Sequence, residues 1–361
     1  MANRTRHILP QEHGFASIMG HDVAKSYLVQ ASDTDVLPHA LLFHGPGGVG
    51  KLSMAYALIK RINCRDNSPA DCECNICRKI SESKFADVLV IEPRGAAGQI
   101  TLTGWRPGKD DPDNLQYYRF VETGPLEGSR KVLILRHADR MNVALSNYIL
   151  KLMEEPPPYL SLILISDKKS DLLPTIRSRC AGVKFGPLPL EDMKKFVESR
   201  GLNPDSPDIA TAVRLSDGRP GNFGEKVSAA AESDQLDLAA AMLSFRKYGF
   251  VSLFRVASDL IDLGDEGGSD AASRFELTLQ KLTSWFRDAI MVKLNADAGG
   301  GLLAFPALRG QLAEFGDGLP ADRLMAAAEA VSGYRPLARR QIDKNYALEC
   351  LLMEIGRIVR G

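Results

Sequence analysis

The sequence predicts an α/β protein with a parallel sheet in its first half and helices in its second half. Short apolar runs typical of buried strands alternate with amphipathic helical patterns from residue 20 to residue 186. A glycine-rich segment follows the first of these runs, as in the strand-to-helix turns of such sheets. From about residue 232 onward, apolar residues recur only at helical spacing. We therefore predict a sheet domain over 1–187, a small helical domain over 188–230 and an all-helical domain over 231–361.

Five apolar runs supply the expected strands. They span residues 41–43, 86–92, 132–135, 161–166 and 182–186. Each is short and rich in Leu, Ile, Val or Phe, which is typical of strands that are buried on both faces of a parallel sheet. The segment over 93–114 between two of these strands is rich in Gly, Pro and Asp and is expected to be a loop. It contains Trp105, Arg106 and Lys109, which are either contacts for DNA or a partner or part of a solvated insertion.

Helical patterns separate the strands. One helix is expected over 21–31, and another runs from the glycine-rich segment to about residue 62. A third helix, with Met141, Leu145 and Leu152 on its apolar face, ends at Glu154-Glu155 because three prolines follow. In the C-terminal region, apolar stripes over 276–294 and 342–358 are typical of the core of a helical bundle.

The composition is that of an ordinary globular protein, because 45% of the 361 residues are hydrophobic and 25% are charged. The 45 basic and 45 acidic residues give a formal net charge of zero, which excludes a bulk electrostatic attraction to nucleic acid. No apolar run is long enough to span a membrane, and the N-terminal residues lack the apolar core of a signal peptide. We expect a cytoplasmic protein, whose six cysteines are then thiols or metal ligands.

The glycine-rich segment has the spacing G-x-x-x-x-G-K and lies between a strand and a helix, so it is a candidate phosphate-binding loop. Backbone N–H groups and the helix N-terminus would bind an anion, and Lys51 would meet the terminal phosphates. The position after the lysine, where a Ser or Thr hydroxyl holds Mg²⁺, is Leu52, and Ser53 lies about 100° further round the helix. A glycine-rich turn without a ligand remains the alternative. The candidate nucleotide-binding residues here are Gly45, Gly48, Gly50, Lys51 and Ser53.

The strand over 132–135 lacks the carboxylates that hydrolysis requires. In P-loop ATPases an Asp at the end of this strand holds Mg²⁺, and a Glu next to it orients the attacking water. This sequence has Arg136 and His137 at those positions, and a guanidinium can neither hold the metal nor act as a base. We therefore expect ATP or ADP to bind weakly or not at all, and we expect no hydrolysis at this site.

Four cysteines within fourteen residues form a candidate zinc site. A structural Zn²⁺ site takes four thiolates at ~2.3 Å, and no open ligand position that would indicate catalysis is apparent. The Cys-x-Cys spacing at its centre is tighter than the usual two-residue gap. The alternative is a loop without metal. The candidate ligands are Cys64, Cys72, Cys74 and Cys77.

Several motifs together resemble the delta-prime subunit family of the bacterial DNA polymerase III clamp loader, within the AAA+ proteins. They include LPHALLFHGPGGVGK, the cysteine module, GPLEGSRKVLILRHADRMN, NYILKLMEEPPP and LLPTIRSRC, and the resemblance covers nearly the whole chain. It implies a RecA-like sheet domain, a helical lid domain and a helical collar domain that oligomerises. The implied partners are the motor (tau/gamma) and delta subunits, the sliding clamp and, through the complex, primed DNA.

The resemblance also implies roles for individual residues. Arg179 of the SRC motif would be an arginine finger that acts in the ATPase site of a neighbouring subunit, although a plain surface arginine is the alternative. Ser166 falls on the position called sensor one. The lid motif of the family ends in an arginine that senses the γ-phosphate, whereas this chain has Asn222 there, with Arg219 nearby.

Three functions remain in view. The first is a non-hydrolysing subunit of the DNA polymerase III holoenzyme that acts in DNA replication by helping to load the sliding clamp. The second is an active AAA+ ATPase, such as the motor subunit of the same loader, which the residues Leu52, Arg136 and His137 disfavour. The third is a small-molecule P-loop kinase, which would need neither the helical tail nor Arg179.

Overall fold

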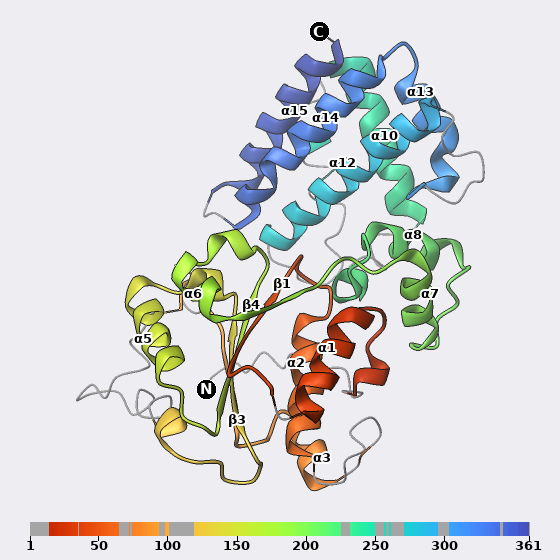
Figure 1. The fold of residues 1–361 in the computed structure, drawn as a ribbon. Helices are drawn as coiled ribbons and strands as arrows, with labels where there is room; N and C mark the ends of the chain where they lie inside the picture. Colours follow the sequence, from red (N-terminus) through yellow and green to blue (C-terminus); the bar gives the residue numbers. More distant parts are fainter. Residues whose placement is uncertain are drawn as a thin grey trace, which may run out of the picture. The chain divides into compact units, whose positions relative to one another are not determined.

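The computed structural model describes residues 14–34, 36–64, 72, 74–93, 98–100, 119–224, 232–249, 256–257, 260, 271–294, 303–339 and 342–360. The chain forms two compact units (Figure 1). The first comprises Met1–Asp192 together with Arg219–Gly221, and the second comprises Met193–Gly218 and Asn222–Gly361. Trp105, Arg106 and Lys109 lie outside the described residues. The division into three domains is not tested by this arrangement and stays a prediction.

The first unit is built on one five-stranded sheet, as the five apolar runs predict. Every neighbouring pair of strands is parallel, and the order across the sheet is β2-β3-β4-β1-β5. All seven residues of β4 are buried, because helices cover both faces of the sheet. The strands are β1 (Ala40–His44), β2 (Val88–Ile91), β3 (Lys131–Arg136), β4 (Leu160–Ser166) and β5 (Ala181–Lys184).

Two apolar cores lie on the two faces of this sheet. One joins the sheet to α1 (Asp22–Asp33), α2 (Lys51–Asn63) and α3 (Asn75–Ser81). The other joins the sheet to α5 (Val143–Glu154) and α6 (Pro174–Arg179). Figure 1 shows these two sets of helices on opposite sides of the strands. The described residues before α7 also form the 3-10 turns η1 (Phe15–Ser17), η3 (Ala138–Arg140) and η4 (Lys169–Asp171).

The register of the central strands positions the candidate site. His44, the last residue of β1, pairs with Ser166, the last residue of β4, so both strands end at the same level. The loop before α2 and the residues after β4 therefore lie together at the carboxyl edge of the sheet, where ligands bind in α/β proteins. The aligned strand ends, and not any one motif, bring these two segments into contact.

The second unit is helical in its described residues. Its apolar core includes Trp285 and Phe286, whose rings pack edge-on against the ring of Phe315. The predicted stripes over 276–294 and 342–358 correspond to α12 and α15. The helices from the lid region onward are α7 (Leu190–Glu198), α8 (Pro207–Leu215), η5 (Pro220–Asn222), α10 (Glu232–Tyr248), α12 (Ala271–Lys293), η7 (Pro306–Leu308), α13 (Arg309–Gly316), α14 (Ala321–Tyr334), η8 (Arg335–Arg339) and α15 (Lys344–Arg360).

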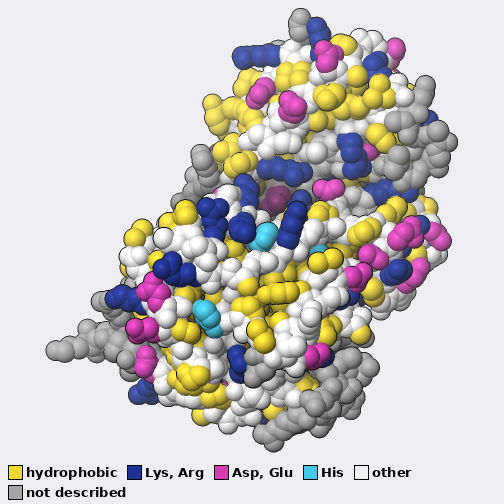
Figure 2. Space-filling view, viewed as in Figure 1, with side chains coloured by type: hydrophobic (Ala, Val, Ile, Leu, Met, Phe, Trp, Pro, Cys, Tyr) yellow, Lys and Arg dark blue, Asp and Glu magenta, His cyan; other side chains and the backbone are white. Residues whose placement is uncertain are grey.

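The surface agrees with the balanced composition. Figure 2 shows both acidic and basic side chains on the visible face, with hydrophobic groups among them. Among the residues that the structure describes, no helix is both long and apolar enough to cross a membrane.

Candidate functional site

The phosphate-binding loop connects β1 to α2. Gly45, Gly48 and Gly50 all have positive φ angles, of 142°, 79° and 97°, which side chains other than glycine rarely adopt. A Cβ atom on Gly45 would lie 2.0 Å from the carbonyl oxygen of Phe185, so a glycine is required there for steric reasons as well. The helix begins at Lys51, with Gly50 at its N-cap. The sequence therefore folds into the expected strand, loop and helix.

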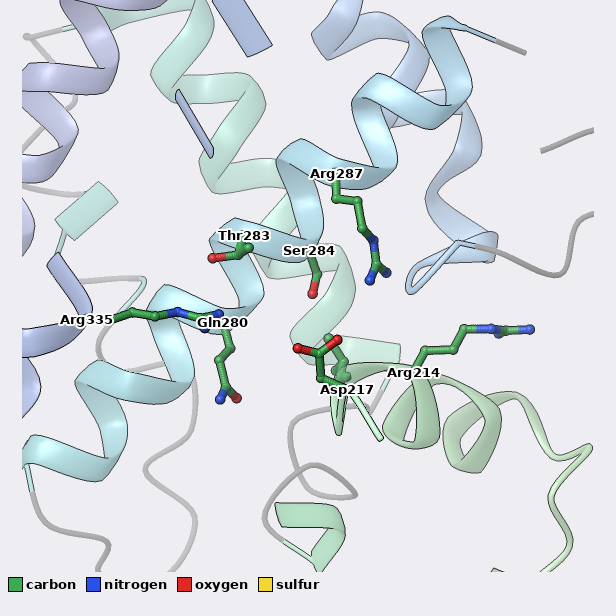
Figure 3. Close-up of a pocket in the computed structure, with 8 residues that line it drawn as sticks. Arg214, Asp217, Gln280, Thr283, Ser284, Arg287 and Arg335 are labelled. Carbon is green, nitrogen blue, oxygen red and sulfur yellow. The ribbon is translucent and has the colours of Figure 1, made fainter. Parts of the chain in front are cut away.

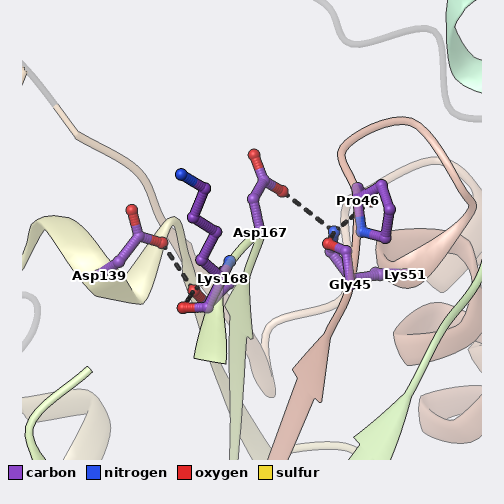
Figure 4. A network of polar contacts seen from close by, with 7 residues as sticks. Gly45, Pro46, Lys51, Asp139, Asp167 and Lys168 are labelled. Carbon is purple, nitrogen blue, oxygen red and sulfur yellow. Dashed lines mark hydrogen bonds and ion pairs between the residues drawn. The ribbon is translucent and has the colours of Figure 1, made fainter. Parts of the chain in front are cut away.

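Lys51 is almost completely buried and makes its contacts within the first unit (Figure 4). Its ammonium group donates to the carbonyl oxygens of Gly45 and Pro46 and to the carboxylate of Asp167, with Nζ 3.0 Å from Oδ1 of Asp167. Burial lowers the pKa of Lys51, and the neighbouring Asp167 opposes this effect. The lysine thus sits in the loop with its charge balanced by a carboxylate from the end of β4.

Asp167 is a site residue that our sequence analysis missed. A polar residue directly after β4, the strand beside β1, is the signal that could have indicated it, because parallel strands present their carboxyl ends at one edge. Its neighbour Ser166 is fully buried, and the Ser166 hydroxyl lies 2.9 Å from Oδ1 of Asp139 and 2.9 Å from the carbonyl oxygen of Lys168. Ser166, expected at the sensor position, therefore ties the turn after β4 to the turn after β3.

The end of β3 carries no carboxylate, and Arg136 forms an ion pair with Glu92 at the end of the neighbouring strand β2. Since β2 lies on the side of β3 that faces away from β1, this pair directs the guanidinium away from the phosphate-binding loop. His137 adopts a left-handed backbone conformation, and burial lowers the pKa of its imidazole. Neither residue is placed to hold a metal ion as an acidic residue would.

The residues at the start of α2 also bear on metal binding. Leu52 packs against the apolar core on one face of the sheet, and Ser53 is partly buried in the first turn of the helix. Because the helix already begins at Lys51, its start is not shifted in the way that would bring Ser53 to the usual metal-binding position.

Two further segments close around the loop. The amide of Gly221 donates to the carbonyl oxygen of Gly48 at 2.8 Å, and a Cβ atom on Gly221 would lie 2.9 Å from the Gly48 Cα. The positive charge of Arg219 contributes to lowering the pKa of Lys51, after burial, which is the main cause. This effect on the pKa indicates that the guanidinium of Arg219 lies near Lys51. On the other side, Nε2 of His21 lies 2.8 Å from the carbonyl oxygen of Val49.

The four cysteines of the candidate zinc site come together. Cys64 caps the C-terminus of α2, and Cys74 and Cys77 lie at the start of α3. All four Sγ atoms lie within 4.8 Å of one another, close to the roughly 3.8 Å edges of a tetrahedron with ~2.3 Å metal–sulfur bonds. The four thiols thus fit a tetrahedral Zn²⁺ ion, and the tight Cys-x-Cys spacing does not prevent their convergence.

The electrostatics around these thiols are uneven. Burial raises the pKa of Cys74, but hydrogen bonds from the Cys77 amide and from neighbouring thiols outweigh it and lower the pKa to about 7. Burial and the neighbouring sulfurs raise the pKa of Cys77. Lys60, one turn before Cys64 on α2, is buried close enough to the four sulfurs for electrostatic interaction. A cation beside four thiolates would offset part of their charge when a metal is bound.

Arg179 is the last residue of α6 and is exposed. Its guanidinium donates to Oε1 of Glu154 at 2.9 Å and to the carbonyl oxygen of Thr175 at 3.2 Å. Glu154 ends α5 just before the three prolines. The structure therefore joins two motifs that are 25 residues apart in the sequence, and it does not bring Arg179 to the phosphate-binding loop through any described contact.

Comparisons with known proteins find similarity to subunits of DNA polymerase III. The sequence profile of the family described as "DNA polymerase III, delta subunit" matches residues 20–189. The "DNA polymerase III subunit delta'" of Bacillus subtilis is 34% identical over 202 residues, which are 55% of this chain and 56% of that protein. The "DNA polymerase III subunit gamma/tau" of Mycobacterium tuberculosis is 30% identical over 212 residues, which are 57% of this chain and 35% of that protein. The aligned segments thus span about half or less of these relatives.

A solved structure of a DNA polymerase III gamma subunit-related protein from Thermotoga maritima aligns with 92% of this chain and 99% of its own chain. Its TM-score is 0.44 and its sequence identity is 17%.

The parallel sheet and the phosphate-binding loop after β1 define a P-loop α/β protein, which confirms the predicted AAA+ fold class. Residues 20–189 match the family model of DNA polymerase III delta subunits, and the predicted resemblance to clamp-loader delta-prime subunits is confirmed.

Proposed function

We propose that this protein is a non-hydrolysing subunit of the DNA polymerase III clamp loader that acts in DNA replication in the cytoplasm. It would join the motor (tau/gamma) and delta subunits, supply Arg179 to the ATPase site of a neighbouring motor subunit, and help to place the sliding clamp on primed DNA. The observation that carries this proposal is the location of Arg179. The arginine is exposed at the end of α6 and pairs only with groups on α5 and α6 among the described residues.

An exposed arginine with a short carboxylate contact suits a role in trans. The guanidinium is a planar fork that meets two phosphate oxygens at once, and in related phosphoryl-transfer systems such an arginine raises the rate about 10³–10⁵-fold. Both side chains of the ion pair between Arg179 and Glu154 are exposed, so the pair contributes little to the stability of the fold. A neighbouring nucleotide could therefore displace Glu154 from Arg179 at small cost.

The chain's own P-loop supports the non-hydrolysing part of the proposal. Hydrolysis needs a metal ligand and a group that orients water at the end of β3, and Arg136 there is paired with Glu92. The loop keeps its amides and Lys51, so a nucleotide would bind weakly through these groups, in competition with Asp167. Zn²⁺ bound by the four cysteines would hold the end of α2 to the start of α3 and would have a structural role.

The second candidate is an active motor subunit, and a specific observation favours it. The support for it is the gamma/tau relative, which is 30% identical to part of this chain. The carboxylates of Asp139 and Asp167 lie near Lys51, where they could partly replace the absent ones. The two candidates differ in a single measurement, since an active motor subunit would hydrolyse ATP when purified alone and would lose this activity in Lys51→Ala.

The experiment that tests the proposal is a clamp loader reconstituted with motor and delta subunits, sliding clamp and primed DNA. Arg179→Ala should assemble normally, because one exposed arginine contributes little to folding, while ATP hydrolysis and clamp loading should fall partially. Arg179→Lys should not restore the rate fully, because an ammonium group cannot reproduce the planar fork. The control is Arg177→Ala, which removes a second arginine from α6. Unchanged hydrolysis and loading in Arg179→Ala would remove the finger from the proposal and leave a scaffold subunit.

A further inference from the structure

Lys60 is a buried lysine that takes no part in the phosphate-binding loop or in the proposed role of Arg179. It lies in the last turn of α2, and only 6% of its surface is exposed. Lysines are almost never buried so completely unless an opposite charge accompanies them, because the ammonium group loses its hydration. The groups around Lys60 therefore decide what its charge does.

Lys60 forms no ion pair with a carboxylate among the residues that the structure describes. Other basic groups do have acidic partners. Lys79 on α3 pairs with Glu127. In the cavity of the second unit, the side chain of Arg214 points away from the other groups, and two carboxylates balance the other two guanidinium groups (Figure 3). Lys60 differs from these groups because it is buried without a carboxylate beside it.

The four cysteines of the candidate zinc site can supply the missing negative charge. Cys64 follows Lys60 by one helical turn, so the two residues lie on the same side of α2 at its C-terminal end. The sulfur atoms of Cys64, Cys72, Cys74 and Cys77 lie within 4.8 Å of one another. Burial lowers the pKa of Lys60, and these four cysteines oppose that effect. The ammonium group and the four sulfur atoms therefore form one electrostatic cluster.

We propose that Lys60 is a charge-balancing residue of the zinc site and that it tightens zinc binding. Four thiolates around Zn²⁺ leave two negative charges in excess, and the ammonium group cancels one of them. Buried opposite charges are stable only together, so the metal-bound thiolates offset the burial of Lys60 and Lys60 offsets the burial of the thiolates. This inference rests on the zinc-binding part of the proposed function.

The proposal gives Lys60 opposite effects on stability in the two states of the site. Zinc binding releases protons from the thiols, so the metal-free site holds fewer thiolates beside the ammonium group. A neutral side chain at position 60 should therefore destabilise the zinc-bound protein and should not destabilise the metal-free protein. A lysine that only packs against the end of the helix would contribute equally in both states.

The test is competition for zinc between the full chain, purified with its metal, and a chromophoric chelator of known affinity. We expect zinc binding to weaken about 10–100-fold in Lys60→Met, which is the usual effect of losing a residue that supports metal ligands. Lys60→Arg should recover most of the affinity because it keeps the charge. The control Lys79→Met removes a lysine whose charge Glu127 already balances, and it should bind zinc as the wild type does.

Urea unfolding with and without zinc separates charge balance from packing. Lys60→Met should unfold at a lower urea concentration than the wild type when zinc is bound. It should unfold at an equal or higher concentration after a chelator has removed the metal. Equal losses in both states would overturn the proposal, because they would assign Lys60 to the packing of the helix.

The zinc affinities can also overturn the proposal. Equal affinity in the wild type and Lys60→Met would do so, and so would equal losses in Lys60→Met and Lys79→Met, which would indicate a general effect of surface charge. Affinity in Lys60→Arg as low as in Lys60→Met would show that the charge is not the property that matters. A wild-type protein without zinc would instead contradict the zinc-binding part of the proposed function, so the two failures are distinguishable.

Discussion

Arg179 donates a hydrogen bond to Glu154, with 2.9 Å between Nη2 and Oε1. The two residues end neighbouring helices, since Glu154 closes α5 and Arg179 closes α6. The pair is the point at which the EEPPP and SRC motifs meet. Because both side chains are exposed, the pair holds the guanidinium at the surface without enclosing it.

We predict that neither member of this pair matters much for stability. Glu154→Gln and Arg179→Ala should each change the free energy of unfolding by less than about 1 kcal/mol, because exposed ion pairs are screened by water. Urea unfolding of the isolated protein measures this. Asp87→Asn is the contrasting control, since Asp87 is fully buried and accepts hydrogen bonds from three backbone amides, and it should cost about 2–4 kcal/mol. A loss above about 2 kcal/mol in Arg179→Ala would show that the arginine is a structural residue.

The contact between Lys51 and Asp167 predicts how the loop responds to nucleotides. Asp167→Asn should tighten ADP binding at least about 10-fold. The Asp167 carboxylate lies 3.0 Å from the Lys51 ammonium group, so it competes with phosphate for that group and also repels phosphate. Lys51→Ala should abolish the remaining binding. The matched control is Asp171→Asn, which removes an exposed carboxylate four positions along the chain. Calorimetric titration with ADP checks these variants, and equal affinities in wild type and Asp167→Asn would contradict the competition.

The convergence of four sulfur atoms within 4.8 Å predicts about one zinc ion per chain. Elemental analysis of protein purified without chelator measures the metal, and Cys77→Ser should lose most of it. Removal of the metal should also lower resistance to urea, because metal binding to the folded state contributes to stability. Cys350→Ser, on α15, is the control and should keep the zinc. A metal-free protein of unchanged stability would favour the loop without metal.

Two glycines of the phosphate-binding loop should respond differently to alanine. Gly50→Ala places a Cβ in open space and costs only the strain of its positive φ, about 1–2 kcal/mol. Gly45→Ala adds a Cβ 2.0 Å from the carbonyl oxygen of Phe185, so we expect a loss of at least about 4 kcal/mol or failure to fold. Urea unfolding of the two variants compares them directly. Similar losses would mean that the backbone near Gly45 relaxes easily.

The sequence by itself determined the elements and the type of each loop. Five apolar runs became five parallel strands, and the glycines before Lys51 became the turn into α2, because both signals are local. The missing carboxylates after β3 were also apparent from the sequence, since position along a strand fixes which residue meets the carboxyl edge. The four cysteines were predictable as a set for the same reason, because they lie within fourteen residues of one another.

Only the tertiary structure decided which distant residues meet. Asp167 reaches Lys51 across 116 positions because β1 pairs with β4 and both end at one level. Glu92 forms an ion pair with Arg136 because β2 is the other neighbour of β3. Glu154 forms an ion pair with Arg179 because α5 and α6 end side by side. Such contacts follow from strand order and helix packing, which the free energy of the whole core selects and no local pattern encodes.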